Sequence, residues 1–206
     1  IHAYRKLERE GLLLILAPRR PERFDEAERK LEAAGIRYVR RSQLPGTLAL
    51  PGVLLLDSIG ELAAVFARAD VVFMGGTLAS RGGHNILEPA YFAKPVIVGP
   101  HMENFAEIAT EFFAAGAMIG IPGAEELAST VDALLREPGS YGVNAQRLAV
   151  SKRGVVERVA RRVLDLIDDG VPEPRRTLAA RIALIPLSKI WEFGNRRDLA
   201  SQRGSL

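Results

Sequence analysis

Short runs rich in apolar residues alternate along the chain with segments in which apolar residues recur every three or four positions. The runs predict strands at residues 12–17, 36–40, 53–56, 71–74, 95–98 and 118–121. The amphipathic segments predict helices at residues 2–10, 21–34, 62–67, 87–92, 105–115 and 124–136. Strands that are apolar on both faces and separated by helices are typical of a parallel sheet covered on both sides. We therefore predict a doubly wound, Rossmann-like α/β domain through about residue 136, closed by helices between residues 140 and 168.

The end of the chain has a different character. Residues 170–176 read Gly-Val-Pro-Glu-Pro-Arg-Arg, which is typical of a linker. Residues 178–193 then combine Leu, Ile and Ala with Trp191, Arg181 and Lys189. We divide the chain into a domain at residues 1–169 and a linker with a basic amphipathic tail at residues 170–206. The tail could lie on an anionic membrane surface or pack against a partner domain, and Pro186, which interrupts it, favours packing.

Composition excludes several classes of protein. The chain has 206 residues, of which 48% are hydrophobic and 26% charged, as in a globular protein. It has no cysteine, which excludes thiol nucleophiles, disulfides and cysteine zinc sites. The longest uncharged stretch, residues 42–56, has 15 residues and two prolines, too few and too interrupted for a membrane span. The sequence thus predicts a soluble, cytoplasmic domain, and a start at Ile1 inside a helical segment predicts a fragment of a longer protein.

The net charge of +3 comes from the tail alone. Residues 1–170 carry 21 Lys and Arg against 22 Asp and Glu, whereas residues 171–206 carry 7 against 3. A nucleic-acid-binding protein usually has a basic face on its folded body. The distribution therefore argues against a nucleic-acid partner.

Residues 70–100 carry the pattern that best predicts a ligand site. A buried strand leads to Gly75 and Gly76, and a second glycine pair, Gly82 and Gly83, precedes a short helix. Paired glycines let a backbone approach a ligand closely, and parallel sheets bind ligands beyond the carboxyl ends of their strands. Taken alone, Gly75 and Gly76 are explained equally well by a turn between the strand and the loop as by a ligand site. The segment matches neither a Walker loop nor the GxGxxG fingerprint, so ATPase and dinucleotide sites lack their motifs.

The helix after the second glycine pair predicts an anion site. Asn85 is a natural N-cap, and N–H groups at a helix start can hold a phosphate. Glu88, about one turn further, could accept hydrogen bonds from a ribose diol. His84 and Glu88 with His101 could instead hold a metal ion, although no HExxH motif supports this. Serine hydrolysis is disfavoured, because Ser80 lies outside any GxSxG motif.

Two further segments are expected at the same sheet edge. Residues 18–24 read Pro-Arg-Arg-Pro-Glu-Arg-Phe after the first strand, and an arginine there could pair with a phosphate in bidentate fashion. Arg20 and Arg23 are equally explained as solvated charges that open a helix. The rim of the cleft is expected to include five further residues: Gly76, Arg81, His84, His101 and Asn104.

These segments resemble a known family. PRRPERF at 18–24, RRSQ at 40–43, LDSIGEL at 56–62, FMGGTLASRGGHNILEPAYFAKPVIVGPHMENF at 73–105 and AGA at 115–117 resemble the C-terminal domain of the Kdo transferases. The resemblance covers residues 5–168. Those enzymes move 3-deoxy-D-manno-octulosonic acid (Kdo) from CMP-Kdo onto the lipid A precursor. The spacing GG-x5-GGHN-x2-EP together with PR-x-PERF is far more specific than any single glycine pair.

The resemblance implies a fold, a reaction and a set of roles. The fold would be the C-terminal half of a two-domain GT-B glycosyltransferase, and the reaction an inverting displacement through an oxocarbenium-like transition state, with no cofactor or metal. Arg19 would contact the phosphate or the cytidine, and Glu88 the ribose. Gly82, Gly83 and Asn85 would hold the phosphate. The protein would act at the cytoplasmic face of the bacterial inner membrane, with CMP-Kdo and the lipid A precursor as its partners.

The sequence also departs from the family pattern. The family usually has Gly-Asp-Thr-Met-Gly-Glu-Leu at 56–62 and His-Thr-Phe-Asn-Phe at 101–105, so that Glu103 adds a charge near the rim. The first strand of the C-terminal domain has no counterpart, nor has the N-terminal acceptor domain with its catalytic carboxylate base. No catalytic residue is therefore assigned, and the fragment alone is expected to be inactive.

Alternative interpretations remain for the tail and for the whole chain. The tail, ALIPLSKIWEFGNRR at 183–197, resembles the start of lipid A 4′-kinases, as in a transferase–kinase fusion. For the whole chain, the alternatives are another GT-B enzyme that uses a UDP-sugar, either a transferase or an epimerase, and a non-catalytic interaction domain of the same fold.

Overall fold

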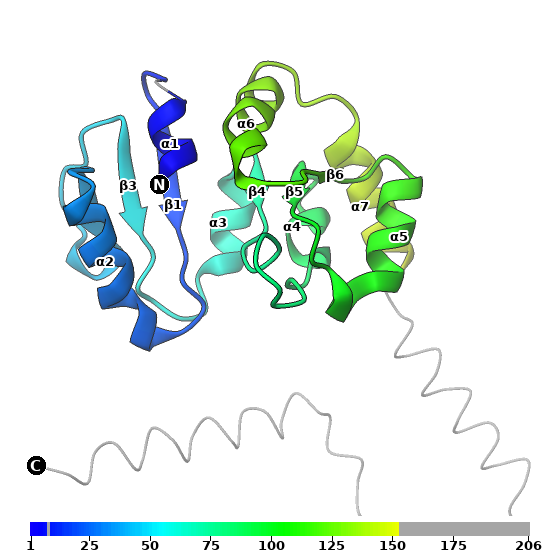
Figure 1. Cartoon of the computed structure of the whole chain (residues 1–206), viewed down its shortest axis with the longest axis horizontal. Coiled ribbons are helices and arrows are strands. Elements are labelled where there is room, and N and C mark those ends of the chain that lie inside the picture. The colour runs from blue at the N-terminus through cyan, green and yellow to red at the C-terminus, as the bar shows by residue number, and fades with distance from the viewer. Residues whose placement is uncertain (8, 153–206) are drawn as a thin grey trace, which may run out of the picture. The chain divides into compact units, whose positions relative to one another are not determined.

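The computed structural model describes residues 1–7 and 9–152 as one unit of alternating strands and helices (Figure 1). Every predicted strand and helix that falls in these residues is present, most of them a residue or two shorter at an end. The closing helix beyond residue 152, the linker and the tail at 170–206, with its membrane and kinase hypotheses, lie outside the described residues. The elements in order are α1 (His2–Lys6), β1 (Leu13–Leu16), η1 (Pro21–Arg23), α2 (Phe24–Ala33), β2 (Tyr38–Arg40), η2 (Arg41–Gln43), β3 (Gly52–Leu55), α3 (Leu62–Arg68), β4 (Val72–Phe73), α4 (Leu87–Tyr91), β5 (Val96–Val98), η3 (Glu103–Phe105), α5 (Ala106–Ala114), β6 (Ile119–Gly120), η4 (Ala124–Glu126), α6 (Leu127–Arg136) and α7 (Tyr141–Ser151).

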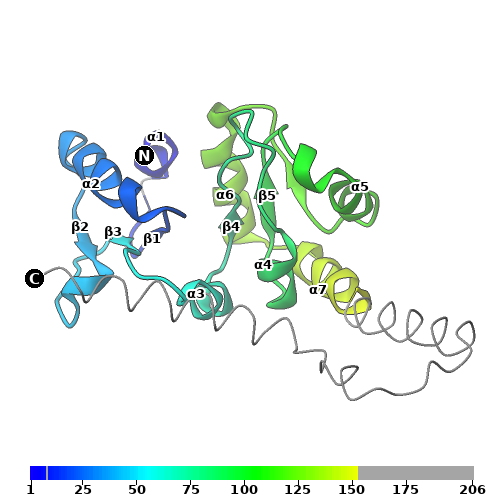
Figure 2. The ribbon, with the colours of Figure 1, turned by 90° about the horizontal axis from the view of Figure 1, so that it is seen from below.

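All strand pairs are parallel, as predicted, but the strands form two sheets instead of one. The first has the order β1-β3-β2 and the second β4-β5-β6. Leu13 lies opposite Gly52 in the first sheet, and Val72 lies opposite Val96 in the second. Figures 1 and 2 both place β1 and β4 at the inner flanks of their sheets, next to each other in order. The expected continuous sheet is interrupted there, because β1 and β4 make no hydrogen bonds with each other.

Helices cover both faces of the strands, which makes the fold doubly wound. In Figure 2, α1, α2, α5 and α6 lie on one side of the strands, and α3, α4 and α7 lie on the other. The helices α2, α3, α4 and α5 lie in the crossovers between parallel strands, which need connections of a dozen or more residues. No helix in residues 1–7 and 9–152 is long and apolar enough to cross a bilayer.

The hydrophobic core is densest around the second sheet. All three residues of β5 are fully buried, because β5 is a central strand with helices on both faces. Met74, Ile86, Phe112 and Met118 pack in one cluster with Val96 and Val98. In the first sheet, Val53 and Leu55 of β3 are fully buried as well. The strand β1 is different, since its four apolar residues are all at least partly exposed and Leu13 is 44% exposed.

Candidate functional site

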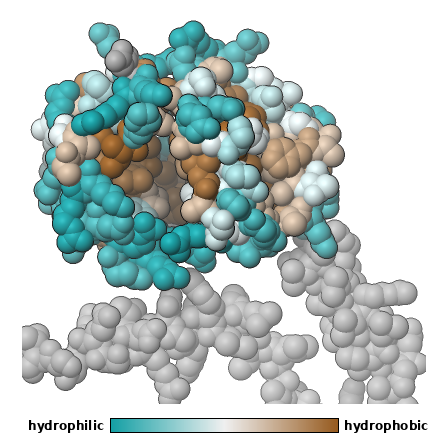
Figure 3. All heavy atoms as spheres, viewed as in Figure 1, coloured by the Kyte–Doolittle hydropathy of each residue, from teal (hydrophilic) through white to brown (hydrophobic). Residues whose placement is uncertain are grey.

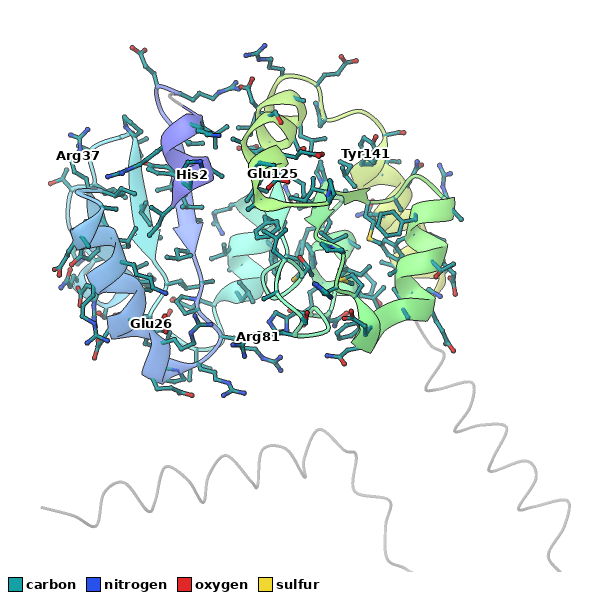
Figure 4. All side chains as sticks on the ribbon, viewed as in Figure 1. His2, Glu26, Arg37, Arg81, Glu125 and Tyr141 are labelled. Carbon is teal, nitrogen blue, oxygen red and sulfur yellow. The ribbon has the colours of Figure 1, made fainter. Side chains whose placement is uncertain are left out.

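A cleft of about 780 Å³ lies where the carboxyl ends of β1 and β4 meet. One wall comes from the residues after β1 and from the start of α2, and the other from the glycine-rich loop (residues 75–85) that follows β4. Figure 4 shows Glu26 and Arg81, one from each wall, at this edge of the molecule. The predicted placement of the glycine-rich loop beyond the carboxyl edge is thereby confirmed. Nine residues line the cleft: Arg19, Arg20, Arg23, Glu26, Ser80, Arg81, Gly83, His84 and Asn104.

The cleft is strongly cationic. Its four arginines face a single carboxylate, that of Glu26. Glu26 already accepts hydrogen bonds from Arg23 at 3.1 Å and Lys30 at 2.5 Å. These bonds, from Lys30 first and Arg23 second, lower the pKa of Glu26 to about 2. Among the described residues, neither Arg19 nor Arg81 has a carboxylate partner. The cleft is therefore built to attract an anion.

Arg19 and His84 meet across the cleft, although 65 residues separate them. The Arg19 guanidinium Nη1 lies 3.1 Å from His84 Nδ1. A guanidinium can only donate, so Nδ1 accepts and carries no proton in this arrangement. Burial of the ring, and after it the charge of Arg19, lower the pKa of His84. The imidazole is thus neutral at pH 7, and Gly76 packs behind it, since a Cβ there would lie 3.3 Å from Nε2.

The second glycine pair is required by neighbours inside the protein. Gly82 and Gly83 both have positive φ, +76° and +74°, a backbone conformation that residues with a side chain rarely adopt. A Cβ on Gly82 would overlap the side-chain amide of Asn104, and one on Gly83 would lie 2.6 Å from Met102 Sδ. Asn104 also donates its backbone N–H to Gly82 O at 3.1 Å and its side-chain amide to Arg81 O at 3.2 Å. These contacts fix the loop against residues 101–104 and explain why Asn104 belongs to the cleft.

Sequence reasoning missed the residue that anchors the start of this loop. The Thr77 side chain is fully buried, and its Oγ1 donates to Met74 O at 2.6 Å and accepts from the Gly99 N–H at 2.7 Å. His101 N–H donates to Thr77 O at 2.9 Å. Thr77 therefore joins the carboxyl ends of β4 and β5. A lone threonine in a polar loop carries no signal of burial, so only the packing reveals its role.

Asn85 and Glu88 lie beside the cleft and do not line it. Asn85 Oδ1 accepts from Leu87 N–H at 3.0 Å, so it caps the first turn of α4 as predicted, one residue before the helix's assigned N-cap. Its side-chain amide donates to Glu88 Oε1 at 3.4 Å, and Glu88 is exposed. Gly76, Gly82 and His101 also stand outside the lining. Of the predicted residues, the structure brings five into the cleft: Arg19, Arg81, Gly83, His84 and Asn104.

His101 reaches the cleft through Ser80. Its Nε2 lies 3.3 Å from Ser80 Oγ, and its Nδ1 lies 2.8 Å from Glu103 Oε1. The hydrogen bond from His101 lowers the pKa of Glu103. The extra charge of Glu103 is therefore held by His101, away from the arginines. Within residues 1–7 and 9–152, no three His, Asp or Glu side chains are grouped closely enough to hold a metal ion, so the structure does not support the disfavoured alternative of a metal held by His84, Glu88 and His101.

Two of the quoted motifs, RRSQ and LDSIGEL, bind each other at the carboxyl ends of β2 and β3. Asp57 accepts from Ser42 N–H at 2.9 Å and Ser42 Oγ at 2.6 Å. Arg41 donates to Glu61 at 2.8 Å, and Ser58 also donates to Glu61. The motifs therefore hold the edge of the first sheet in shape and do not line the cleft.

Replacing Asp57 by alanine is expected to lower the free energy of unfolding by about 1.5–3 kcal/mol at pH 7, the usual contribution of hydrogen bonds to a buried charge. Burial raises the pKa of Asp57, but the Ser42 hydrogen bonds and the charge of Arg40 outweigh it and lower the pKa overall. This stability is present above the unfolded pKa of about 3.9 and is lost as the pH falls through the lower folded value. Urea unfolding between pH 7 and pH 3 measures it. Asp25→Ala is the control, because the exposed Asp25 bonds the same Arg40 and should cost under about 1 kcal/mol; equal losses would contradict the assignment.

Comparisons with known proteins agree with this geometry. A 3-deoxy-D-manno-octulosonic acid transferase of Bordetella pertussis is 41% identical over 166 residues, which are 76% of this chain and 37% of that protein. One from Haemophilus influenzae is 42% identical over 130 residues, 61% of this chain and 28% of that protein. The crystal structure of the C-terminal CMP-Kdo binding domain of WaaA from Acinetobacter baumannii superposes with a TM-score of 0.63 and 35% identity, over 69% of this chain and 75% of that domain. No protein-family model matches.

The parallel α/β fold, taken with these likenesses, is that of the C-terminal domain of GT-B glycosyltransferases. Within that class, the chain belongs to the 3-deoxy-D-manno-octulosonic acid transferase family. It spans about a third of the length of the curated relatives that it matches.

Proposed function

We propose that the cleft binds the CMP part of CMP-Kdo, and that the longer protein transfers Kdo from this donor to the lipid A precursor. The observation that carries the proposal is the cationic cleft, in which Arg19 and Arg81 lack carboxylate partners, in a chain 35% identical to a CMP-Kdo binding domain. A parallel α/β fold binds ligands at this edge. CMP is a phosphate monoester that leaves as an anion, so it suits these arginines.

The arginines would supply the contribution of this half to catalysis. As the bond to the sugar breaks, negative charge develops on the departing phosphate and positive charge on the anomeric carbon. A guanidinium already in place stabilises the phosphate through paired, charge-assisted hydrogen bonds. Arg19 is the best placed, because it stands beside a neutral imidazole and not beside a carboxylate. The bound phosphate would also raise the pKa of His84.

The roles of the remaining residues follow from their present partners. Gly83 N–H donates to Gly76 O, and Leu87 N–H donates to Asn85 Oδ1, so these backbone groups are already used. We therefore assign the phosphate mainly to the arginine side chains, with Gly82, Gly83 and Asn85 shaping the loop around it. Glu88, exposed and held by Asn85, would accept hydrogen bonds from the ribose diol.

The rest of the reaction belongs to other parts of the longer protein. We infer that the lipid A precursor and the base that deprotonates its hydroxyl are provided by a further domain, and that transfer takes place at the cytoplasmic face of the bacterial inner membrane. The displacement is proposed to be inverting and to need no metal, because the arginines can neutralise the leaving phosphate.

Isothermal titration of residues 1–206 with CMP tests the assignment. Arg19→Ala and Glu88→Ala are each expected to weaken binding roughly tenfold or more, since a hydrogen bond to a charged group contributes about 1.5–3 kcal/mol. Arg29→Ala, which removes an exposed arginine of α2 outside the cleft, should leave the affinity unchanged. An unchanged affinity of Arg19→Ala for CMP would show that the phosphate does not bind in this cleft.

Parallel titrations with UDP separate the alternatives. Binding of UDP in the absence of any CMP binding would favour a UDP-sugar transferase or epimerase. Binding of neither nucleotide would favour a non-catalytic interaction domain.

A further inference from the structure

Among the residues that the structure describes, two arginines of the cleft lack a carboxylate partner, and they stand on opposite walls. Arg19 follows β1, and its guanidinium contacts the neutral ring of His84. Arg81 belongs to the glycine-rich loop, and its guanidinium has no hydrogen-bond or ion-pair partner within residues 1–7 and 9–152. Figure 4 shows the Arg81 side chain pointing outward from the loop at the carboxyl edge. An unpaired guanidinium on each wall suits a ligand that has two anionic groups.

The other two arginines of the cleft have acidic neighbours on their own wall. Arg23 donates to Glu26 at 3.1 Å, and Arg20 Nη1 lies 4.0 Å from Glu22 Oε1. In Figure 3, hydrophilic residues predominate along the lower edge of the molecule, where Figure 1 places the loops after β1 and β4. The edge therefore suits a polar, charged ligand, and the charges left for that ligand are those of Arg19 and Arg81.

The backbone that carries Arg81 is held in place before any ligand arrives. Arg81 N–H donates to Ala79 O at 2.6 Å, and Arg81 O accepts from the Asn104 side-chain amide at 3.2 Å. The next residue, Gly82, accepts from Asn104 N–H at 3.1 Å. A ligand thus has to order the Arg81 side chain but not its loop, which lowers the entropic cost of binding.

A second donor, the hydroxyl of Ser80, lines the cleft beside Arg81 and is held from behind. Ser80 Oγ lies 3.3 Å from His101 Nε2, and His101 Nδ1 lies 2.8 Å from Glu103 Oε1. When the ring is protonated, both of its nitrogens donate, Nδ1–H to the Glu103 carboxylate and Nε2–H to Ser80 Oγ. The Ser80 O–H is then free to donate into the cleft. Arg81 and Ser80 together offer the donors that a carboxylate needs.

These residues are features of this chain and not of the family pattern. Ser80 and Arg81 occupy two of the five unspecified positions in the spacing GG-x5-GGHN. Glu103 stands where the family usually has phenylalanine. The chain therefore has a set of polar contacts on this wall that the shared motif does not specify.

The donor has two anionic groups next to each other. Kdo is a 2-keto sugar acid, so in CMP-Kdo the phosphate oxygen and the carboxylate are both attached to the anomeric carbon. Two like charges at this separation repel each other. A cleft with one unpaired cation on each wall can neutralise both, one from each side. After transfer, the carboxylate leaves with the sugar and the phosphate leaves with CMP.

We propose that Arg81 and Ser80 form a second anion subsite, which binds the carboxylate of the donor sugar, while Arg19 binds the phosphate. His101 and Glu103 are positioning residues, because they act through the Ser80 hydroxyl. The subsite rests on the proposed function of the cleft and adds recognition of the sugar acid to it. A donor whose sugar has no carboxylate would leave the Arg81 charge unpaired, and the cleft would discriminate against it.

Titration of residues 1–206 with CMP-Kdo and with its methyl ester tests the subsite. The ester keeps the sugar, the phosphate and the cytidine, and it removes the charge of the carboxylate. The unaltered chain is expected to bind the acid roughly tenfold or more tightly than the ester, as for a hydrogen bond to a charged group. Arg81→Gln should weaken binding of the acid by the same factor and leave the ester unchanged. Arg29→Gln, outside the cleft, is the control and should keep both affinities.

A double-mutant cycle tests the positioning role of Glu103. Ser80→Ala and Glu103→Ala are each expected to reduce the preference for the acid by about threefold, in the range of one net hydrogen bond. In a chain that already carries Ser80→Ala, Glu103→Ala should have no further effect, because its action passes through the hydroxyl. Glu103 is exposed, so the melting temperature should stay unchanged. Independent, multiplicative effects of the two substitutions would contradict the positioning role.

Three results would overturn the subsite. Equal weakening of acid and ester by Arg81→Gln would assign Arg81 to the phosphate. Equal affinity of the unaltered chain for acid and ester would mean that the carboxylate has no subsite in this cleft. In both of these results CMP still binds, so the proposed function stands and the subsite falls. If CMP, the acid and the ester all failed to bind, the proposed function would fall together with the subsite.

Discussion

Purified residues 1–206 are expected to bind CMP and to transfer no measurable Kdo to the lipid A precursor. The displacement needs a base for the acceptor hydroxyl, and such a base typically contributes about 10²–10⁴-fold. Glu26, the single carboxylate among the cleft's lining residues, bonds Lys30 and Arg23, and its pKa of about 2 makes it a very weak base at pH 7. Glu88 is assigned to the ribose and would stand on the side of the leaving group. Loss of acceptor positioning raises the barrier by several kcal/mol more.

Transfer of radiolabelled Kdo to the lipid A precursor measures this directly. The longer protein, with the remainder of its chain in place, is the positive control, and in that protein Arg19→Ala should reduce the rate. Transfer by residues 1–206 alone, abolished by Glu26→Gln, would show that this half carries its own base and would contradict the division of roles between the domains.

Gly99→Ala is expected to lower the free energy of unfolding by about 3 kcal/mol, and the melting temperature by about 6–12 °C. A Cβ on Gly99 would overlap Thr77 O and lie 2.6 Å from Thr77 C and 2.8 Å from Leu78 N. All three are backbone atoms, so no side chain can rotate to make room. Thr77 would have to shift, which breaks its hydrogen bonds to the Gly99 and His101 N–H groups. The glycine-rich loop would move with it, and the affinity for CMP should fall as well.

Gly75→Ala is the matched control for this substitution. Gly75 lies in the glycine-rich loop, as Thr77 does, and its φ is not positive. No atom lies within 4 Å of the position that its Cβ would take. Thermal unfolding should therefore detect a change of no more than about 2 °C, because surface substitutions without contacts usually stay within about 0.5 kcal/mol. If both variants lost the same stability, the contact between Gly99 and Thr77 would not be the cause.

The runs rich in apolar residues predict every strand of the described residues, and the signal is clearest where a strand is buried on both faces and is therefore apolar throughout. The run at residues 95–98, for instance, predicted β5, all of whose residues are buried. Parallel pairing followed from the helices between the strands, and it placed Arg19 and the glycine-rich loop at one edge. The quoted motifs, compared with a known family, predicted the class of enzyme.

Tertiary structure alone decided which polar residues share the cleft. The contact between Arg19 and His84 joins loops 65 residues apart, and the neutral state of His84 follows from burial that no local pattern reveals. The position of Glu26 in the cleft was not predicted, because its spacing from Arg23 and Lys30 is typical of ion pairs on the surface of any helix. The apolar runs likewise did not predict the break between β1 and β4. Apolar runs specify that strands form, but backbone hydrogen bonds, which every residue can make, decide which strands are neighbours.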